Sequence, residues 1–250
     1  MTHVALVRRI VVYESTTSTN DDARRLARDG APEGTVVVAE RQTEGRGRLG
    51  RTWDSPHLTG LYVSVLLRPV EPLALLGRYA IAGAVVACAT CRDVAGDRVV
   101  LKWPNDVIAE GAKLAGILAE IRQGSSGAEL VLGFGINVNQ AREDFPAALR
   151  VNATSLRMLR GGASLGRESV AMALLESLSD AIGRIRGEAW PDVAEQFLRY
   201  APSATGCRVR LAGGGEGSTS GLDDSGALRV TTAVGVVLAH ASESVTLLEG

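Results

Sequence analysis

The segment 45-GRGRLGR-51 concentrates cations in a chain whose formal net charge is -1. Arg46, Arg48 and Arg51 alternate with glycines, which let backbone amides approach a bound molecule closely. Arginine forks match carboxylate and phosphate oxygens in pairs, and Trp53 offers an aromatic face to a base. The pattern predicts an anion-binding loop that becomes ordered around its ligand. A solvated basic turn or a disordered RGG-like segment that binds nucleic acid would share this composition.

Only two of the 27 basic residues are lysines, Lys102 and Lys113. A chain that otherwise relies on arginine is expected to keep lysine where a compact point charge is needed. Both lie in 101-LKWPNDVIAEGAKLAGILAE-120, whose W-P-N-D turn presents Asn105 and Asp106 directly after a strand. An amide and a carboxylate beside a lysine suit a nucleotide with Mg²⁺. We interpret the segment as a hairpin with one lysine on each arm.

A third polar cluster, 15-STTSTND-21, precedes an expected helix. Ser18, Thr19 and Asn20 are residue types that commonly cap helices, which is the simplest interpretation. Their hydroxyl and amide groups lie beside the free N–H groups of the first helical turn, so they also suit a small polar group or an anion.

Histidine and cysteine are scarce, with three of each. A histidine-based metal site or catalytic dyad is therefore nearly excluded. Cys88 and Cys91 have C-x-x-C spacing but lie in an apolar run, and we interpret them as core residues. No apolar run approaches the roughly 20 residues that span a bilayer, and the N-terminus lacks the pattern of a secretory signal. We expect a soluble cytoplasmic protein that has no membrane partner.

Apolar periodicity predicts a mixture of strands and helices without regular βαβ alternation. The expected strands are 8–14, 35–40, 61–68, 98–103, 114–121 and 129–139, and the expected helices are 18–30, 73–92, 168–186 and about 191–200. This mixture favours an α+β fold in residues 1–203, with a mixed β-sheet layered with helices. Short strands between glycine turns predict a small SH3-like β-barrel over residues 204–250, packed on the first domain.

Five motifs in one order resemble the biotin protein ligases. They are S-T-N at 18–20, Q-x-x-G-R-G-R-x-G-R-x-W at 42–53, K-W-P-N-D at 102–106, K-x-x-G-I-L at 113–118 and G-x-G-x-N-V-N at 133–139. The resemblance implies a class II synthetase-like catalytic domain and a two-step reaction. Biotin and ATP would give biotinyl-5′-adenylate, and a lysine of a biotin carboxyl carrier domain would then displace AMP. A lipoate or octanoate ligase or transferase of related fold is one alternative, and a non-catalytic nucleotide- or RNA-binding module is another.

The resemblance also implies roles for particular residues. Lys113 and Arg48 are expected to be catalytic. Biotin is expected to contact Ser18, Thr19, Asn20, Gln42, Arg46, Arg48, Lys113, Gly116 and Leu118. The nucleotide is expected to contact Arg46, Arg51, Trp53, Lys102, Asn105, Lys113 and Asn137, with Asp106 helping to bind Mg²⁺. Because the first strand begins near residue 8, we expect no winged helix-turn-helix before it. The prediction is a monofunctional enzyme that does not bind DNA, either a monomer or a homodimer.

Overall fold

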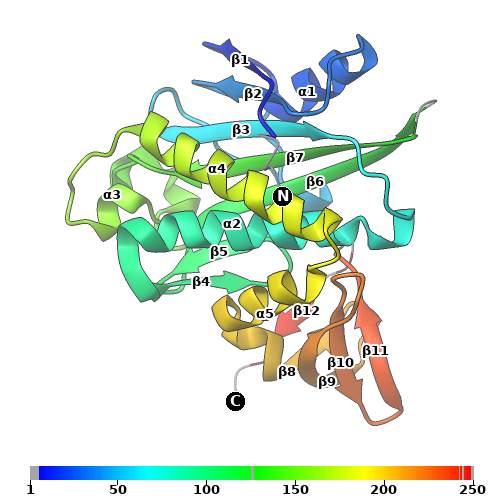
Figure 1. Ribbon diagram of the computed structural model, residues 1–250. Helices are drawn as coiled ribbons and strands as arrows, with labels where there is room; N and C mark the ends of the chain where they lie inside the picture. The colour runs from blue at the N-terminus through cyan, green and yellow to red at the C-terminus, as the bar shows by residue number, and fades with distance from the viewer. Residues whose placement is uncertain (1–5, 125–126, 242, 244, 249–250) are drawn as a thin grey trace.

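The computed structural model describes residues 6–124, 127–241, 243 and 245–248. A seven-stranded sheet forms the body of the molecule, and a five-stranded sheet lies at its C-terminal end (Figure 1). The large sheet has the order β1-β2-β3-β7-β6-β5-β4, with β1 and β2 parallel and the other neighbours antiparallel. Its strands are β1 (Arg9–Tyr13), β2 (Thr35–Ala39), β3 (Gly60–Leu67), β4 (Val99–Lys102), β5 (Asp106–Ala109), β6 (Ala112–Gly124) and β7 (Gly127–Asn137).

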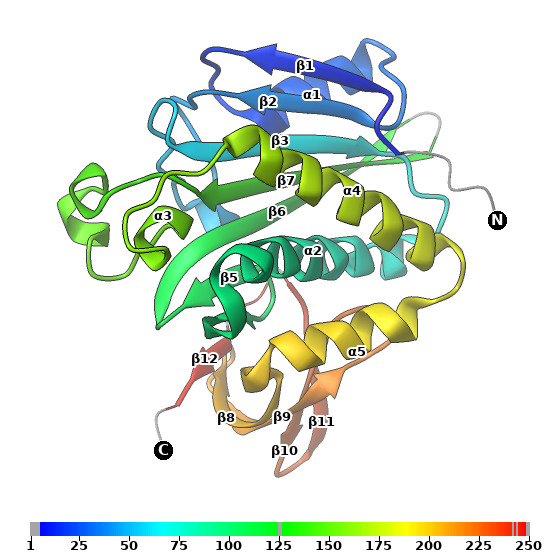
Figure 2. The ribbon, with the colours of Figure 1, turned by 60° about the vertical axis from the view of Figure 1, so that its left-hand side comes forward.

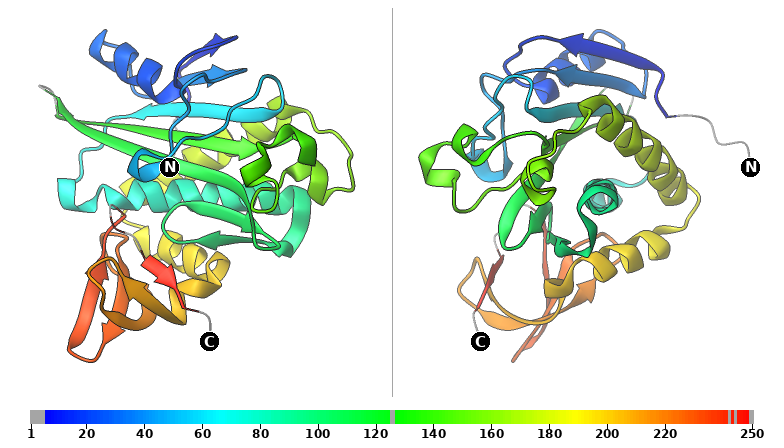
Figure 3. Two further views of the ribbon diagram at one scale, coloured as in Figure 1. Left: turned by 180° about the vertical axis from the view of Figure 1, so that it is seen from behind. Right: turned by 90° about the vertical axis from the view of Figure 1, so that its left-hand side faces the viewer.

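Helices cover both faces of the large sheet. They are α1 (Thr19–Arg28), α2 (Gly77–Ala95), α3 (Leu156–Leu159), α4 (Arg167–Arg186) and α5 (Trp190–Tyr200). Helix α2 lies along one face, and α4 and α5 pack over it, as the turned views show (Figures 2 and 3). The fit of α2 is close, because a Cβ on its Gly83 would lie 3.0 Å from Leu132 of β7. Every residue of β3 is buried because this strand is covered on both faces.

Helix α1 covers part of the opposite face through a small apolar core of its own. That core contains Ala23, Ala27, Ala31, Val37, Leu66 and Val131. Along each strand, alternate residues face α1 and α2, as expected for a pleated sheet. Beyond the end of α1, the α1 face of β6 and β7 carries glycines and polar residues instead of an apolar layer.

The interpretation of 101–120 as one hairpin with a lysine on each arm was wrong. A four-residue strand, β5, lies between the two lysines, so Lys102 pairs with Asp106 on β5 and Lys113 lies on β6. Positive φ angles at Glu110 (53°) and Gly111 (80°) form the tight second turn that separates β5 from β6. The run V-I-A was too short to stand out as a strand in the sequence.

Among the described residues, the segment Leu73–Arg98 is long and apolar enough, by length and composition alone, to cross a membrane. The expectation that no apolar run approaches this length was therefore wrong. The structure explains the composition differently, because most of α2 is buried between the sheet and the outer helices. Its residues form the core of the molecule.

The C-terminal sheet has the order β11-β10-β9-β8-β12, which is consistent with an SH3-like domain. Its strands are β8 (Thr205–Leu211), β9 (Glu216–Leu222), β10 (Leu228–Thr232), β11 (Gly235–Ala239) and β12 (Val245–Leu247). Within the described part of the chain, no pairing between β11 and β12 closes the sheet into a barrel. Val209, Leu228 and Val230 join the main core, so this sheet packs on the large one as expected. The division at residues 203 and 204 stays a prediction.

Cysteine reactivity offers a direct test of this packing. Cys88 and Cys91 are fully buried in α2. Burial raises the pKa of both thiols, to about 12 for Cys88. The thiolate is the reactive form, so both groups stay protonated until the pH approaches that value. At pH 8 we expect one thiol of the folded chain, that of Cys207, to react with a chromogenic disulfide reagent. In the denatured chain we expect all three thiols to react. Rapid reaction of two or more thiols in the folded chain would contradict this.

Candidate active site

Three glycines form a floor on the face of the large sheet that α1 partly covers. Gly116 of β6 pairs with Gly135 of β7, and Gly133 lies two residues earlier on β7. A Cβ on Gly133 would lie 2.2 Å from Oδ1 of Asn20, and one on Gly135 would lie 2.5 Å from the indole of Trp53. Real Cβ atoms essentially never approach other atoms so closely. Both glycines are therefore needed for Asn20 and Trp53 to lie against the sheet.

Buried hydrogen bonds cross one end of this floor. Ser64 Oγ lies 2.6 Å from Asn20 Oδ1 and 2.7 Å from Thr19 Oγ1. Gln42 Oε1 accepts from the Thr19 N–H at 2.9 Å, and Gln42 Nε2 donates to Ser55 Oγ at 2.9 Å. Fixed donors and acceptors of this kind suit a polar head group better than a hydrocarbon chain. We refer to Asn20, Ser64, Thr19, Gln42 and Ser55 as the polar relay.

Capping does not account for the polar cluster before α1. Ser18 occupies the N-cap position with extended backbone (φ -158°, ψ 132°), but its hydroxyl makes no capping hydrogen bond. Thr19 and Asn20 use their side chains in the polar relay. The hydroxyl of Ser18, a residue only 3% exposed, lies next to that relay in the chain and can turn toward a ligand.

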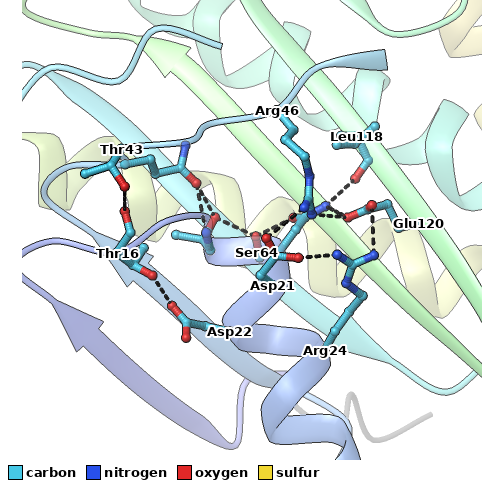
Figure 4. A network of polar contacts seen from close by, with 12 residues as sticks. Thr16, Asp21, Asp22, Arg24, Thr43, Arg46, Ser64, Leu118 and Glu120 are labelled. Carbon is cyan, nitrogen blue, oxygen red and sulfur yellow. Dashed lines mark hydrogen bonds and ion pairs between the residues drawn. The ribbon is translucent and has the colours of Figure 1, made fainter. Parts of the chain in front are cut away.

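Arg46 is bound by two carboxylates of the chain itself (Figure 4). Its guanidinium lies 2.7 Å from Asp21 and 3.2 Å from Glu120, and Arg24 contacts the same two carboxylates. Burial opposes ionisation of Asp21, but the hydrogen bonds and charges of Arg46 and Arg24 outweigh it and hold the pKa of that carboxyl below its ordinary value. Arg46 therefore anchors its loop to α1 and β6.

Arg48 is fixed on the other side of the same loop. Its Nη1 donates to Asn105 Oδ1 at 2.9 Å, and its Nη2 donates to the carbonyl oxygens of Ala241 and Glu243. Burial lowers the pKa of Arg48 from its ordinary value. The chain thus supplies partners for both arginines, and the expected ordering of the loop around its ligand stays a prediction.

Lys113 lies at the other end of the floor. Its Nζ is 2.7 Å from Asp106 Oδ1 and 5.4 Å from the centroid of the Trp53 ring. The backbone of Lys113 forms a bridge with Ala153, and Asn137 Nδ2 donates to the Lys113 carbonyl oxygen at 3.4 Å. Asn137 is buried, and these contacts are those of a residue that positions Lys113. Its expected contact with a nucleotide stays a prediction.

The remaining expected nucleotide contacts, Lys102 and Arg51, are exposed. Among the described residues, no group of three or more His, Cys, Asp or Glu side chains could hold a metal ion. Mg²⁺ often binds through one or two carboxylates together with substrate phosphates. The single carboxylate of Asp106 fits this mode of binding, in which the phosphates provide the other ligands.

Ser64 and Glu120 are among the residues of the site that the sequence analysis did not single out. Ser64 is fully buried inside the apolar strand 61-LYVSVLLR-68. A polar residue within this apolar run could have indicated a functional hydroxyl. Glu120 follows Gly116 and Leu118 at alternate positions of β6, so strand periodicity places it on the same face. Glu120 ends the quoted segment 101–120, but no role was predicted for it.

The arrangement suits an elongated acid with a polar head group. The polar relay lies at the Leu118 end of the floor. At the other end, the Lys113 Nζ would lie 3.5 Å from a Cβ on Gly116. A carboxylate directed toward Lys113 would lie beside the positively charged groups that a phosphate also requires. The groups gathered at that end are Arg48, Asn105, Asp106 and Lys113.

Substitution of Gly133 by alanine tests the floor. Its Cβ would displace the Asn20 amide and break the polar relay, so we expect binding of the acid to weaken by about 1–3 kcal/mol. Gly215→Ala is the matched control, because nothing lies within 4 Å of a Cβ there. Titration calorimetry with biotin, the acid implied by the sequence motifs, would measure the change. Equal affinity in the Gly133 variant and the parent would show that Asn20 does not depend on this glycine.

Comparisons with known proteins show the family of this chain. The model of the biotin/lipoate A/B protein ligase family matches residues 12–137. The biotin--[acetyl-CoA-carboxylase] ligase of Mycobacterium tuberculosis is 37% identical over 248 residues, which cover 96% of this chain and 90% of that protein. The bifunctional ligase/repressor BirA of Bacillus subtilis is 34% identical over 230 residues, covering 91% of this chain and 70% of the relative.

A solved structure extends the likeness to nearly the whole fold. The biotin protein ligase of Aquifex aeolicus in complex with biotin and ATP has a TM-score of 0.82 and 29% identity. The match covers 96% of this chain and all of that one. The chain belongs to the biotin/lipoate A/B protein ligase family.

Proposed function

We propose that this chain is a biotin protein ligase, which activates biotin with ATP and transfers it to a lysine of a biotin carboxyl carrier domain. The observation that carries the proposal is the placement of Lys113. It stands at the end of a glycine floor whose other end is a buried polar relay. Biotin has the matching chemistry, with a ureido head group of N–H donors and a carbonyl acceptor, and a carboxylate at the far end of its tail.

The first step joins two anions. A carboxylate oxygen of biotin attacks the α-phosphorus of ATP, the bond to the β-phosphate oxygen breaks, and pyrophosphate leaves. Lys113 would contact both the carboxylate and the α-phosphate, and Arg48 would stabilise the charge that develops on the phosphoryl oxygens. Asp106, with the phosphates of ATP, would hold Mg²⁺, which supplies further charge neutralisation when bound. This chemistry requires no nucleophile from the protein.

The second step breaks the mixed anhydride. The amine of the acceptor lysine attacks the acyl carbon, the bond to the phosphate oxygen breaks, AMP leaves and the nitrogen loses a proton. Between the steps the loop carrying Arg46 and Arg48 would shield the anhydride from water. The anchors of this loop on Glu120 and Asn105 support such a role.

The lipoate and octanoate ligases or transferases are the alternative within the family. Their acids present a dithiolane or a plain hydrocarbon chain where biotin presents hydrogen-bonding groups. Such a chain would place apolar groups against the polar side chains of Thr19, Asn20 and Gln42 and would add no hydrogen bond to them. The polar relay therefore favours biotin.

Pyrophosphate release tests the proposal. The chain would be incubated with ATP and Mg²⁺ and with biotin, lipoate or octanoate, in the absence of any acceptor. We expect release with biotin alone, followed by transfer of label to a purified carrier domain. Release with lipoate or octanoate in place of biotin would overturn the assignment, and release with none of them would point to a non-catalytic binding module. Cytoplasmic location, the absence of DNA binding and a monomeric or homodimeric state stay predictions.

Lys113→Arg distinguishes a point charge from a planar fork. The variant keeps the charge, but its wide guanidinium would crowd the carboxylate and phosphate beside Asp106. We expect adenylate formation to fall nearly as far as in Lys113→Ala, by about 2–4 kcal/mol in transition-state free energy. Single-turnover pyrophosphate release measures this fall. Near-normal turnover by the arginine variant would exclude the proposed role.

Arg48→Ala tests retention of the intermediate. Without its contacts to Asn105 and the C-terminal carbonyls, the loop loses one of its two anchors. We expect biotinyl-adenylate to escape, so that it accumulates free in solution and surface lysines of a bystander protein such as albumin become biotinylated. Arg199→Ala, on the exposed surface of α5, is the control. If Arg48→Ala retained its adenylate as the parent does, the loop would not act as a lid.

A further inference from the structure

Glu120 receives hydrogen bonds from three residues, two on helix α1 and one in the arginine loop (Figure 4). Asn20, at the start of α1, donates from Nδ2 to Glu120 Oε2 at 2.7 Å. Arg46 of the arginine loop contacts the same oxygen at 3.2 Å, and Arg24 contacts Oε1 at 3.1 Å. One side chain on β6 therefore touches both the polar relay and the loop that covers it.

The orientation of the Asn20 amide follows from its bond partners. A carboxylate only accepts, so Asn20 must direct its NH₂ group toward Glu120 and its Oδ1 toward Ser64. The carbonyl oxygen of Leu118 also accepts from Asn20 Nδ2, at the longer distance of 3.5 Å. Glu120 therefore provides the shorter of the two contacts that orient this amide within the polar relay.

The same carboxylate fixes the loop. Arg46 contacts Asp21 on one side and Glu120 on the other, and Arg24 completes a set of two positive and two negative charges. Asp21 takes part in this set but has no contact with Asn20 among those described. Among the described residues, Glu120 is the member of the ion-pair set whose side chain also contacts the polar relay, through Asn20.

We propose that Glu120 is a positioning residue for the reaction, which orients the Asn20 amide in the biotin head-group site and couples it to closure of the arginine loop. The inference rests on the proposed function for the identity of the ligand. It does not require Glu120 to touch biotin, ATP or the reacting atoms. Its effect should therefore fall on biotin affinity and loop order.

Glu120→Gln separates these effects from loss of packing. Glutamine keeps the shape, but its NH₂ group must face either the Asn20 amide or an arginine, which are all donors. The Asn20 amide then loses its fixed orientation or the loop loses its anchor. The matched control is Glu129→Gln, because Glu129 is also partly buried and paired with an arginine, Arg68, at 3.0 Å.

Three measurements on the full chain test the proposal. Calorimetry with biotin in the absence of ATP should show affinity weaker by about tenfold or more in Glu120→Gln, as for a lost hydrogen bond to a charged group. Amide hydrogen exchange of peptides covering 43–53 should be at least several-fold faster. The side-chain amide signals of Asn20, identified by their loss in Asn20→Ser, should shift in ¹⁵N spectra. Glu129→Gln should match the parent in all three.

Asp21→Asn provides a second comparison. It should accelerate exchange in the loop without shifting the Asn20 amide signals, because Asp21 belongs to the ion-pair set alone. Parent-like exchange and Asn20 signals in a folded Glu120→Gln chain would overturn the inference. So would equal losses in Glu129→Gln, which would indicate general destabilisation. Failure of the proposed function would appear differently, because the parent would not bind biotin. The hydrogen-exchange and Asn20 amide measurements do not require biotin, so they would still test the role of Glu120.

Discussion

The amide of Asn20 and the indole of Trp53 lie against β7 at distances that no side chain on that strand would permit. A sheet covered on both faces normally fills the intervening space with apolar side chains, as Val131 and Leu66 do under α1. Gly133 and Gly135 continue the same face with backbone alone, so polar groups can approach the strand itself. Because glycine replaces apolar side chains here, the polar relay and Trp53 can lie against the sheet. The position of Lys113 beyond them depends on the same feature.

Positive charge in the site is divided between anchoring and the reaction. Arg46 is balanced by Asp21 and Glu120, whereas the contacts of Arg48 are with an amide oxygen and two carbonyl oxygens. Neutral oxygens orient a guanidinium without cancelling its charge. Arg48 therefore keeps an attraction for an anion that Arg46 has largely used within the chain. Two arginines separated by one glycine thus have different electrostatic environments.

The sequence predicted most elements of the fold because its apolar periodicities were long and clear. The short strand β5 was missed, since four residues between two turns carry too little periodic signal. The motifs contained the glycines of the floor and drew attention to Lys113 and the arginine loop, but they did not predict the floor itself. They did not reveal that the loop is anchored, because the carboxylates that bind Arg46 lie 25 residues before it and 74 residues after it. Glycine content alone suggested mobility, and only the fold shows which partners oppose it.

The two anchors of the loop differ in their physical character. The ion pairs of Arg46 involve side chains that are 24–36% exposed, so each pair is partly screened by water and contributes little by itself. Their effect depends on the set acting together with the buried amide of Asn20. Arg48 instead reaches carbonyl oxygens near the end of the chain, almost two hundred positions away. Because these oxygens belong to the segment that joins β11 to β12, the C-terminal sheet must be docked for the loop to keep its second anchor. The position of that sheet is therefore part of the geometry of the site.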